Sequence, residues 1–432
     1  MTPTIRRPLR RAGAAAAALA LSLAAAACTI EDKDKAAAPG AAPGAARTDT
    51  PGVTADSIKL GISYPDFAAV KAFVNIDQGD FEATYKALID KVNAAGGIHG
   101  RKIVPVFAKT SLVSPAAAQE ACVKLTQDEK VFAVVNLMPG NAQVPCYTQT
   151  NRTAVIGSPL EPEMNAAAQA PWFSFDTGLI PRKSVEAFAA RGDLAGRKVA
   201  IATVSGDEAQ TSAQVLPALQ AAGITPVANG TITMGGADPA VLGQQAGVLF
   251  QKAQASGADT LLLVGGAAQI IPQVLEKTTW RPRLLFTVIP SGYTTGKGQH
   301  DFGTLKDSVA GSQIVDWSDP ALTACADTVA QADPSLAGKL VDPATVGGGQ
   351  PTPGASMASA CRNLALFKAI ADKAGPTLDY TTFRQAGNSL GRFHIPGFRE
   401  DADYGPDTPD GAIPVRATVY DPAGNRFVPA PN

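Results

Sequence analysis

Short apolar runs and amphipathic helical stretches alternate along the chain from residue 57 onward. Runs such as Val131–Val135 are apolar at every position and lack the in-and-out alternation of a half-exposed strand. Continuous runs of this kind are typical of parallel strands that helices cover on both faces. The sequence therefore predicts an α/β fold of mainly parallel sheets flanked by helices.

The alternation runs through two consecutive series, which predicts two similar lobes. The first series has expected strands at 58–62, 102–107, 131–135 and 153–156, with helices beginning after Asp80 and at 115–128 and 140–150. The second has helices at 181–191, 208–222, 239–255 and 267–278 and strands at 198–204, 225–232, 260–264 and 284–288. Residues 319–390 read as mostly helical, and 415–428 as a hairpin that turns at 422–425. We expect lobe 1 over 57–178, lobe 2 over 179–312, a return to lobe 1 over 313–390, and a final segment on lobe 2 or the hinge over 391–432.

The N-terminal residues have the pattern of an export signal. Several arginines precede an Ala/Leu-rich run at 12–27, which is shorter than the roughly 20 residues of a membrane-spanning helix. Residues 25–28, Ala-Ala-Ala-Cys, resemble a lipobox, in which the cysteine is acylated and becomes the mature N-terminus. We expect a lipoprotein signal at 1–27, a lipid on Cys28 and a disordered Ala/Pro/Gly-rich tether at 28–56. An ordinary cleaved signal is the alternative, and both the general and the twin-arginine export routes stay open.

Charge excludes one class of partner. The whole chain has 37 basic and 38 acidic residues, and removal of the signal takes away four arginines, which leaves a net charge of -5. A nucleic-acid-binding domain needs a strongly basic surface, so no nucleic-acid partner is expected. The predicted location is the outer face of the cytoplasmic membrane.

Four cysteines remain once Cys28 is assigned to the lipid. An even number in an exported chain predicts disulfides, and four cysteines allow three connectivities. Pairing Cys122 with Cys146 and Cys325 with Cys361 is favoured because each pair would join neighbouring helices; buried free thiols are the alternative. None of the spacings suits a zinc site, so neither a metal nor another cofactor is expected.

The chain offers little for catalysis, and the sequence predicts that it is not an enzyme. His99, His300 and His394 lie far apart on predicted turns and are expected at the surface. No Gly-x-Ser-x-Gly nucleophile elbow occurs. The Gly-rich run at 292–298 has the wrong spacing for a phosphate loop and lacks its Ser/Thr.

Four segments carry a family resemblance. They are VNAAGGIHGRKIVPVF (92–107), KLTQDEKVFAVVN (124–136), AGRKVAIATV (195–204) and GADTLLLVGG (257–266). In this order and spacing the chain resembles the leucine/isoleucine/valine-binding family, the type I solute-binding proteins of ABC importers. The resemblance implies two α/β lobes that are joined by three crossing strands and hold the ligand between them.

Ligands of open α/β sheets bind outside the carboxyl ends of the strands, which places the candidate site residues. In the first lobe these are Tyr64, Asp66, Met138, Gly140, Asn141, Ser158 and Glu161; in the second they are Glu208, Gly266, Ala267 and Tyr293. Asp77 is a further first-lobe candidate, because the resemblance places it near a position where the family has an aromatic residue.

The amino-acid clamp that the resemblance implies is not evident in this sequence. Glu208 and Ala267 align where amino-acid binders have aromatics, and Val288 and Ile289 align where they have an acid. Asp77, Glu161 and Glu208 could instead receive a cationic or polyhydroxy ligand, unless they are solvated loop acids.

The sequence thus predicts a monomeric, lipid-anchored capture protein of an ABC importer. It would bind a small polar solute, such as an amino acid, an amide or a related compound, and deliver it to a membrane permease. A lipid-anchored sensor with the same lobes and an exported α/β enzyme are the alternatives.

Overall fold

The computed structural model describes residues 50–67, 77–111, 115–136, 143–233, 239–294, 300–346 and 349–431. Cys28, Met138, Gly140 and Asn141 lie outside these ranges, as do the predicted signal and most of the predicted tether.

The first sheet is parallel throughout and has the strand order β2-β1-β3-β4-β5. Its strands are β1 Ser57–Asp66, β2 Lys102–Ser111, β3 Ala133–Asn136, β4 Ala154–Gly157 and β5 Trp172–Phe173. Ile62 at the centre pairs with Phe107 on one side and Val135 on the other. The four strands expected from their apolar runs are confirmed, and the two-residue β5 is an addition.

Helix α1, Phe81–Ala94, begins where its sequence predicts. The Asp80 side chain accepts a hydrogen bond from the backbone N–H of Ala83, which caps the helix, and Tyr85 is among the side chains that the helix buries. After the helix the chain reverses at Gly97, whose φ is +70°. A Cβ there would lie 2.0 Å from the carbonyl oxygen of Arg101, so only glycine fits this turn.

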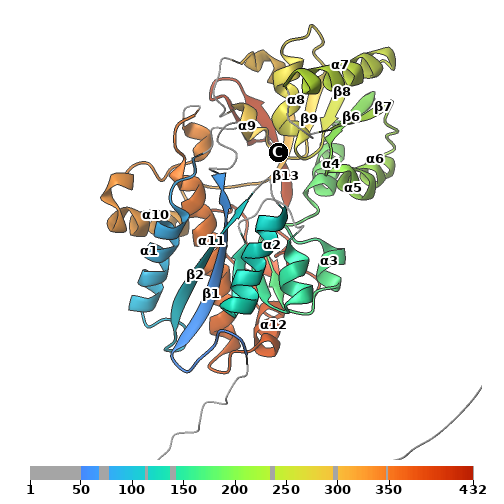
Figure 1. The fold of residues 1–432 in the computed structure, drawn as a ribbon. Coiled ribbons are helices and arrows are strands. Elements are labelled where there is room, and N and C mark those ends of the chain that lie inside the picture. The colour runs from blue at the N-terminus through green and yellow to red at the C-terminus, as the bar shows by residue number, and fades with distance from the viewer. Residues whose placement is uncertain are drawn as a thin grey trace, which may run out of the picture. The chain divides into compact units, whose positions relative to one another are not determined.

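Helices cover both faces of the first sheet (Figure 1). Helix α2, Pro115–Val123, continues as a π-helical turn at Lys124–Asp128 and shares a core cluster with the π-helical turn Cys146–Thr150. Helix α3, Pro162–Ala166, follows β4. The opposite face is covered by α1 together with later helices.

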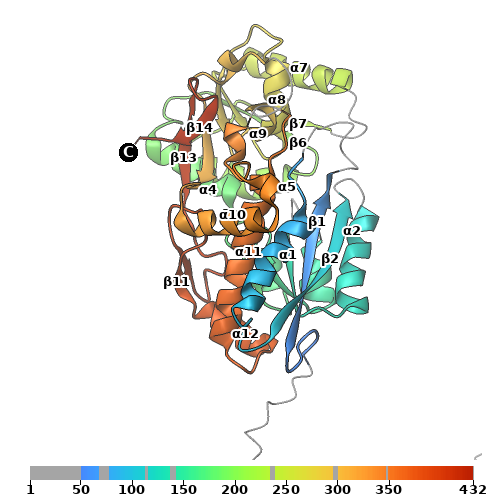
Figure 2. The same cartoon turned by 90° about the vertical axis from the view of Figure 1, so that its left-hand side faces the viewer.

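Those later helices are α10 Pro320–Ala332, α11 Pro353–Ala374 and α12 Tyr380–Asn388. Figure 2 shows α10 and α11 beside α1. Phe367 of α11 and Phe383 of α12 pack against Phe132 at ring-centroid distances of 6.4 and 5.3 Å. The chain thus returns to the first core after it has built most of the second sheet.

The second sheet has the order β14-β13-β10-β9-β8-β6-β7. Its parallel strands are β6 Val199–Val204, β7 Ala228–Ile232, β8 Thr260–Leu263, β9 Arg283–Phe286 and β10 Val309–Gln313. The predicted hairpin is confirmed as β13 Val415–Asp421 and β14 Arg426–Pro429, and β13 runs antiparallel to β10. Strand β10 was not expected, because its sequence VAGSQ is short and mixes small with polar residues.

Helices also pack on both faces of this sheet. One core cluster includes residues of α4 Ile180–Arg191 and α6 Leu216–Ala221; between β6 and α6 lie α5 Glu208–Gln210 and a π-helical turn at Thr211–Val215. The other cluster includes residues of α7 Pro239–Ala255, α8 Ala267–Leu275 and α9 Ser291–Thr294. The second series of predicted helices and strands is therefore present in the expected order.

One part of the chain lies elsewhere than expected. The segment after α12 forms a small hairpin from β11 Gly391–Phe393 and β12 Ala402–Tyr404. Ile395, Phe398 and Tyr404 from this segment are buried in the first core, not on the second lobe. Apolar side chains spaced along an irregular segment do not reveal which core they enter. The predicted placement on the second lobe or the hinge applies to residues 405–414, which connect the two sheets, and to the hairpin from Val415 onward.

Among the described residues, three segments connect the two sheets: 174–179, 314–319 and 405–414. Backbone hydrogen bonds tie them to one another and to the β11–β12 region. Ser174 N–H donates to the Pro409 carbonyl at 2.9 Å, and Asp316 N–H donates to the Gly397 carbonyl at 2.8 Å. We call these three segments the hinge.

Both predicted disulfides are present. Cys122 of α2 bonds to Cys146, the first residue of the π-helical turn Cys146–Thr150, and Cys325 of α10 bonds to Cys361 of α11. Each bridge joins neighbouring helical elements, as their spacing predicted. Within the described ranges, no helix is both long and apolar enough to cross a membrane.

Candidate ligand-binding site

The loops at the carboxyl ends of β6, β8 and β9 are held together by side-chain hydrogen bonds. Asp207, after β6, accepts the N–H of Gly266 after β8, with an N···Oδ2 distance of 2.8 Å. Gly265 N–H donates to Thr287 Oγ1 at 3.0 Å, which links the β8 and β9 loops. Gln269 of α8 donates to the Ile289 carbonyl and accepts from Gly292 N–H. The three loops therefore form one framework.

Asp207 is the centre of this framework. Burial raises the pKa of its carboxyl group, the hydrogen bond from Gly266 opposes the rise, and neighbouring Glu208 adds to it. A Cβ at Gly265 would lie 2.3 Å from Asp207 Oδ2, and Gly265 has a φ of +55°. The close approach of carboxylate and backbone thus requires glycine after β8.

The four residues predicted for the second-lobe site lie in different environments. Glu208 is exposed, and its Oε2 accepts from Gly206 N–H at 2.6 Å. Gly266 presents its N–H to Asp207, as described above. Ala267 and Tyr293 are fully buried, so a ligand reaches them only if neighbouring groups move. Their role as ligand contacts stays a prediction.

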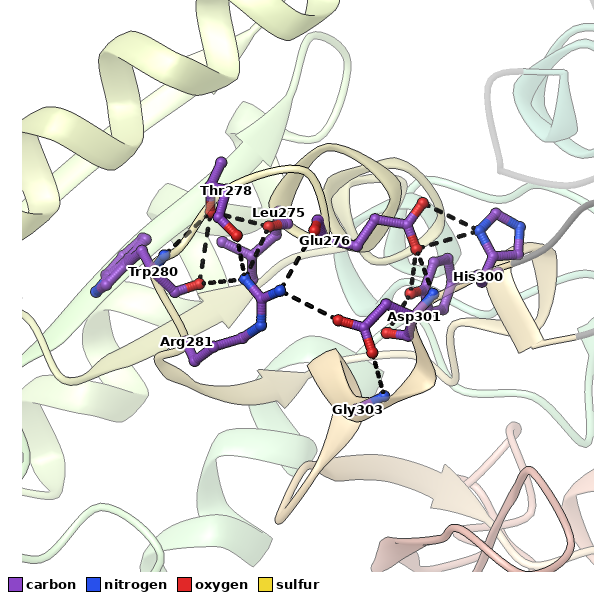
Figure 3. A network of polar contacts seen from close by, with 9 residues as sticks. Leu275, Glu276, Thr278, Trp280, Arg281, His300, Asp301 and Gly303 are labelled. Atoms are coloured by element: carbon purple, nitrogen blue, oxygen red, sulfur yellow. Dashed lines mark hydrogen bonds and ion pairs between the residues drawn. The ribbon is translucent and has the colours of Figure 1, made fainter.

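Tyr293 belongs to a polar network beneath the β9 loop, part of which is drawn in Figure 3. Its hydroxyl donates to Glu276 Oε2 at 2.7 Å, and Glu276 also accepts from Asp301 N–H and contacts His300 Nδ1 at 3.2 Å. Burial acts to raise the pKa of Glu276, but these hydrogen bonds outweigh it and lower the pKa. The His300 side chain is only 12% exposed, so the expectation of a surface histidine was wrong. Sequence could not reveal this because its partner Glu276 lies on another element.

Arg281 extends the network to the end of α8. Its Nη1 donates to the backbone carbonyl of Leu275, the last residue of α8, and to those of Thr278 and Trp280 in the turn that follows. Its Nη2 donates to Asp301 Oδ2 at 3.1 Å (Figure 3). A cation at a helix C-terminus satisfies carbonyls that have no intrahelical partner. The described segment that begins at His300 is thereby fixed to α8.

In the first lobe, Tyr64, Asp66 and Asp77 line one cavity of about 440 Å³, which we call the first-lobe cavity. It lies where β1 ends and α1 begins, and its lining also includes Phe67, Asp80, Phe81, Glu82 and Lys109. Four carboxylates against one amine make it acidic. The structure thus brings together three of the predicted site residues, two from a strand end and Asp77 from the resemblance.

Aromatic rings and a tyrosine–glutamate hydrogen bond shape this cavity. The rings of Tyr64 and Phe81 stack with their centroids 5.6 Å apart, and Phe67 approaches Phe81 at 6.4 Å. The Tyr64 hydroxyl donates to Glu82; burial and this carboxylate raise the pKa of Tyr64. Sequence reasoning did not assign Glu82 and Phe81 to the site, because it considered strand ends and aligned family positions but not the start of the next helix. The first turn of the next helix is the signal that would have found them.

Ser158 and Glu161, predicted for the same site, do not line the first-lobe cavity. Ser158 is buried after β4 with a φ of +63°. Glu161 is the residue before α3, and a Cβ at Gly178 would lie 2.5 Å from its Cγ. Glu161 therefore lies against the first hinge segment, and a ligand role for either residue stays a prediction.

Comparison with known proteins agrees with this architecture. The family model of periplasmic binding proteins matches residues 57–418. The chain belongs to the periplasmic binding protein family. Its members are extracytoplasmic solute-binding proteins of ABC transporters, which bind small ligands, deliver them to membrane permeases and are not enzymes. The predicted resemblance and type I fold are thus confirmed.

Solved structures show the same fold at low sequence identity. A substrate-binding protein from Desulfitobacterium hafniense in complex with Leu has a TM-score of 0.59 and 15% identity, with 87% of this chain and all of that chain covered. A fatty acid ABC transporter substrate-binding protein from Thermomonospora curvata has a TM-score of 0.61 and 15% identity, with 89% of this chain and 93% of that chain covered. A leucine-binding protein from Thermotoga maritima has a TM-score of 0.61 and 11% identity, with 87% of this chain and 98% of that chain covered. No curated protein sequence matches the chain significantly.

Beside the second hinge segment of this periplasmic binding protein, a histidine is held between two carboxylates. His394 Nε2 lies 3.1 Å from Asp319 Oδ2, and its Nδ1 lies 3.0 Å from Asp401 Oδ1. Only the protonated imidazole donates from both nitrogens. Burial alone would lower the pKa of His394, but the two carboxylates outweigh it and raise the pKa above 6.5.

Replacing His394 by asparagine should therefore destabilise the protein at low pH more than at high pH. A raised folded-state pKa gives stability that is fully present below pH 6.5 and is lost as the pH rises through the folded-state value. We expect a loss below about 1 kcal/mol at pH 5.5, because the side chain is partly exposed, and a smaller loss at pH 8.5. Urea unfolding of the wild type and the variant at both pH values measures these two losses of stability.

His99→Asn is the matched control, since His99 is exposed and contacts only the Asp372 carbonyl among the described residues. The control should show no pH-dependent difference. An effect of His394→Asn that is equal at the two pH values would contradict the assignment of a charged imidazole.

Proposed function

We propose that this periplasmic binding protein captures a small polar solute, such as an amino acid, an amide or a related compound. We further propose that a lipid on Cys28 holds it at the outer face of the cytoplasmic membrane. The observation that carries the solute proposal is the acidic, aromatic-walled cavity at the carboxyl end of β1. Parallel α/β sheets place their ligands at this edge.

The charge of the first-lobe cavity suggests how a solute is held there. Asp66, Asp77, Asp80 and Glu82 give it an excess of carboxylates over the single amine of Lys109. An ammonium group of the solute would be attracted to this side, and aromatic faces such as Phe67 and Phe81 also favour cations. The framework around Asp207 is the candidate second wall, since its glycine-rich loops leave backbone groups close to a ligand.

Relatives of similar fold bind different solutes by their printed names, leucine in two cases and fatty acid in one. Capture would follow the hinge mechanism of two-lobed binding proteins, in which the ligand favours the closed state by binding it better. Thermal-shift screening over amino acids, amides, polyamines and sugars tests the proposal. A solute at 100 times its Kd should add about 2.7 kcal/mol to the unfolding free energy. Absence of any shift across the panel contradicts it.

Asp77→Asn should weaken binding of an ammonium-bearing solute about tenfold, measured by calorimetry. The reason is that a charge-assisted contact is lost, which contributes about 1.5 kcal/mol or more. Asparagine still accepts the hydrogen bond that Gly79 N–H donates to Asp77 Oδ1, so the local turn is kept. Asp90→Asn, an exposed acid on α1, makes the same charge change and should leave the Kd unchanged. Equal effects of the two substitutions would remove Asp77 from the site.

Cys28→Ser should release the protein from membranes into the soluble fraction. The thioether that carries the lipid cannot form without the sulfur. Fractionation of cells that express the two forms, with intact-mass measurement of the purified proteins, checks this. A Cys28→Ser form that stays membrane-bound and keeps the wild-type acyl mass would contradict the lipid anchor.

A further inference from the structure

Each of the three hinge segments carries an acidic residue that interacts electrostatically with others at the hinge. Arg362 of α11 acts on Asp176 in the first segment and on Asp319 in the second, and Asp410 in the third acts on Asp176. We propose that the loss of a proton from Asp176 changes the conformation of the hinge, so that the balance between its conformations depends on pH. This inference goes beyond capture of a solute and does not depend on which solute the protein takes.

The first observation is that Asp176 and Arg362 each leave a buried atom without a direct bond. Within the described residues, neither Asp176 Oδ1 nor Arg362 Nη2 makes a hydrogen bond, and both atoms are shielded from solvent. A buried polar atom without a partner is unfavourable, and more so when its group is charged. The two groups attract each other, yet the described conformation of the hinge does not pair them.

Charged and titratable groups from several elements surround Asp176. Burial raises the pKa of its carboxyl group to about 7; the cation of Arg362 opposes the rise, and Asp410 adds to it. Asp410 Oδ2 in turn lies 3.8 Å from Lys183 Nζ of α4. The Tyr404 hydroxyl donates to a backbone carbonyl of the first hinge segment and keeps its proton here, since burial raises its pKa well above 10. Asp176 therefore changes its charge near neutral pH, close to groups of both signs.

The other carboxylate on which Arg362 acts is already engaged. Asp319 Oδ2 accepts the Gly397 N–H at 2.6 Å and lies 3.1 Å from His394 Nε2. Arg362 itself is anchored through Nε, which donates to the Pro396 carbonyl at 3.0 Å. Its Nη2 is thus left for a carboxylate that moves toward it.

Rotation of the lobes would move Asp176 relative to Arg362, because the first hinge segment is bonded to both lobes. The Asp176 carbonyl accepts from the N–H of Leu160 in the first lobe at 2.9 Å. The Gly178 carbonyl accepts from Gln214 Nε2 in the second lobe, also at 2.9 Å. Arg362, in contrast, belongs to α11, which packs in the first core. Hinge motion is absorbed by a few residues of such connecting segments.

The two protonation states of Asp176 therefore favour different hinge conformations. An ionised Asp176 gains from a direct bond to Arg362 and from separation from Asp410, whereas a protonated Asp176 gains little from either. The described conformation leaves Asp176 Oδ1 and Arg362 Nη2 unbonded, so we assign it to the protonated form. The proton thus acts as a ligand that binds one conformation better than the other.

Electron–electron distance measurements on the solute-free protein test the proposal. Spin labels are attached at Asp90→Cys on α1 and Gln254→Cys on α7, which are exposed positions on different lobes. Between pH 5 and pH 9 we expect a transition between two distances, with its midpoint near 7. The ratio of the two populations should change about tenfold, which corresponds to a difference of about one pKa unit between the conformations.

Three variants assign the transition to its residue. Asp176→Asn should show no transition, and Asp410→Asn should shift the midpoint to lower pH because it removes the acid that raises the pKa of Asp176. His394→Asn is the control for the other group that titrates beside the hinge, and it should keep the transition. Thermal melting confirms that each variant folds.

The proposal is overturned if the wild-type distance does not change with pH, or if the transition persists in Asp176→Asn. A transition that is lost in His394→Asn and kept in Asp176→Asn would assign the effect to the histidine instead. Because no solute is added, these results stand apart from the test of solute capture.

Discussion

Replacing Arg362 by methionine is expected to lower the free energy of unfolding by about 3 kcal/mol at pH 8. Arg362 lies on α11 beneath the hinge; its Nε donates to the Pro396 carbonyl at 3.0 Å, and its guanidinium lies 4.6 Å from the centre of the Phe398 ring. It also acts electrostatically on the hinge carboxylates Asp176 and Asp319. Methionine would keep much of the volume but leave these carboxylates without their cation.

The pH dependence of the stability of Arg362→Met distinguishes the loss of the arginine's charge from the loss of its packing contacts. Burial raises the pKa of Asp176 from 3.8 to about 7, although Arg362 acts to lower it. A carboxyl whose folded-state pKa is raised binds more protons in the folded state, so its ionisation costs stability as the pH rises. Without Arg362 the pKa of Asp176 rises further, so ionisation of this carboxyl lowers the free energy of unfolding at pH 8 by a larger amount. At pH 5 Asp176 is protonated in both proteins, so the variant should lose less there.

Chemical unfolding at pH 5 and pH 8 measures both effects. Lys368→Met, on the same helix and paired with Asp372, is the matched control; this half-exposed pair should contribute no more than about 0.5 kcal/mol. A loss for Arg362→Met that does not change with pH would mean that packing alone is affected.

Replacing Cys122 and Cys146 together by alanine is expected to cost about 3 kcal/mol. The bridge closes a loop with a sequence separation of 24, and loop closure of this length restricts the unfolded chain by an amount of that order. Cys122 is fully buried, so alanine is a better replacement than serine, whose hydroxyl would need a partner. Thermal unfolding without reductant measures the loss.

The corresponding change at Cys325 and Cys361, with a separation of 36, is the natural comparison and should cost slightly more. Intact-mass analysis after thiol labelling shows that each variant keeps the other bridge. Wild-type melting behaviour in both variants would show that the bridges do not stabilise the fold.

Much of the fold could be predicted because local signals and tertiary structure agree. Residues 133–135 of the predicted apolar run lie in the buried parallel strand β3, and the Asp80 cap starts α1 where periodicity places it. Strand β10 was missed because its small residues serve a close contact. A Cβ at Gly311 would lie 1.9 Å from Ser184 Oγ of α4, so this position cannot hold the bulky apolar side chain that would predict a strand.

The candidate site was only partly predictable, for a related reason. Tyr64 and Asp66 could be predicted because they lie at the carboxyl end of the first strand. In a parallel α/β sheet, ligands bind at the edge formed by these strand ends. The environment of Tyr293 depends on Glu276, which lies on another element, and no local pattern reveals such a partner.

The edge position of the C-terminal hairpin has a consequence for biosynthesis. A nascent chain that has emerged as far as β12 contains every strand of the first sheet, but β10 at the border of the second sheet still lacks β13. An unpaired strand edge invites pairing with other chains. Premature termination before Val415 would therefore yield an aggregation-prone product and not a smaller binding protein. Folding of the second sheet should therefore depend on the last two strands of the chain.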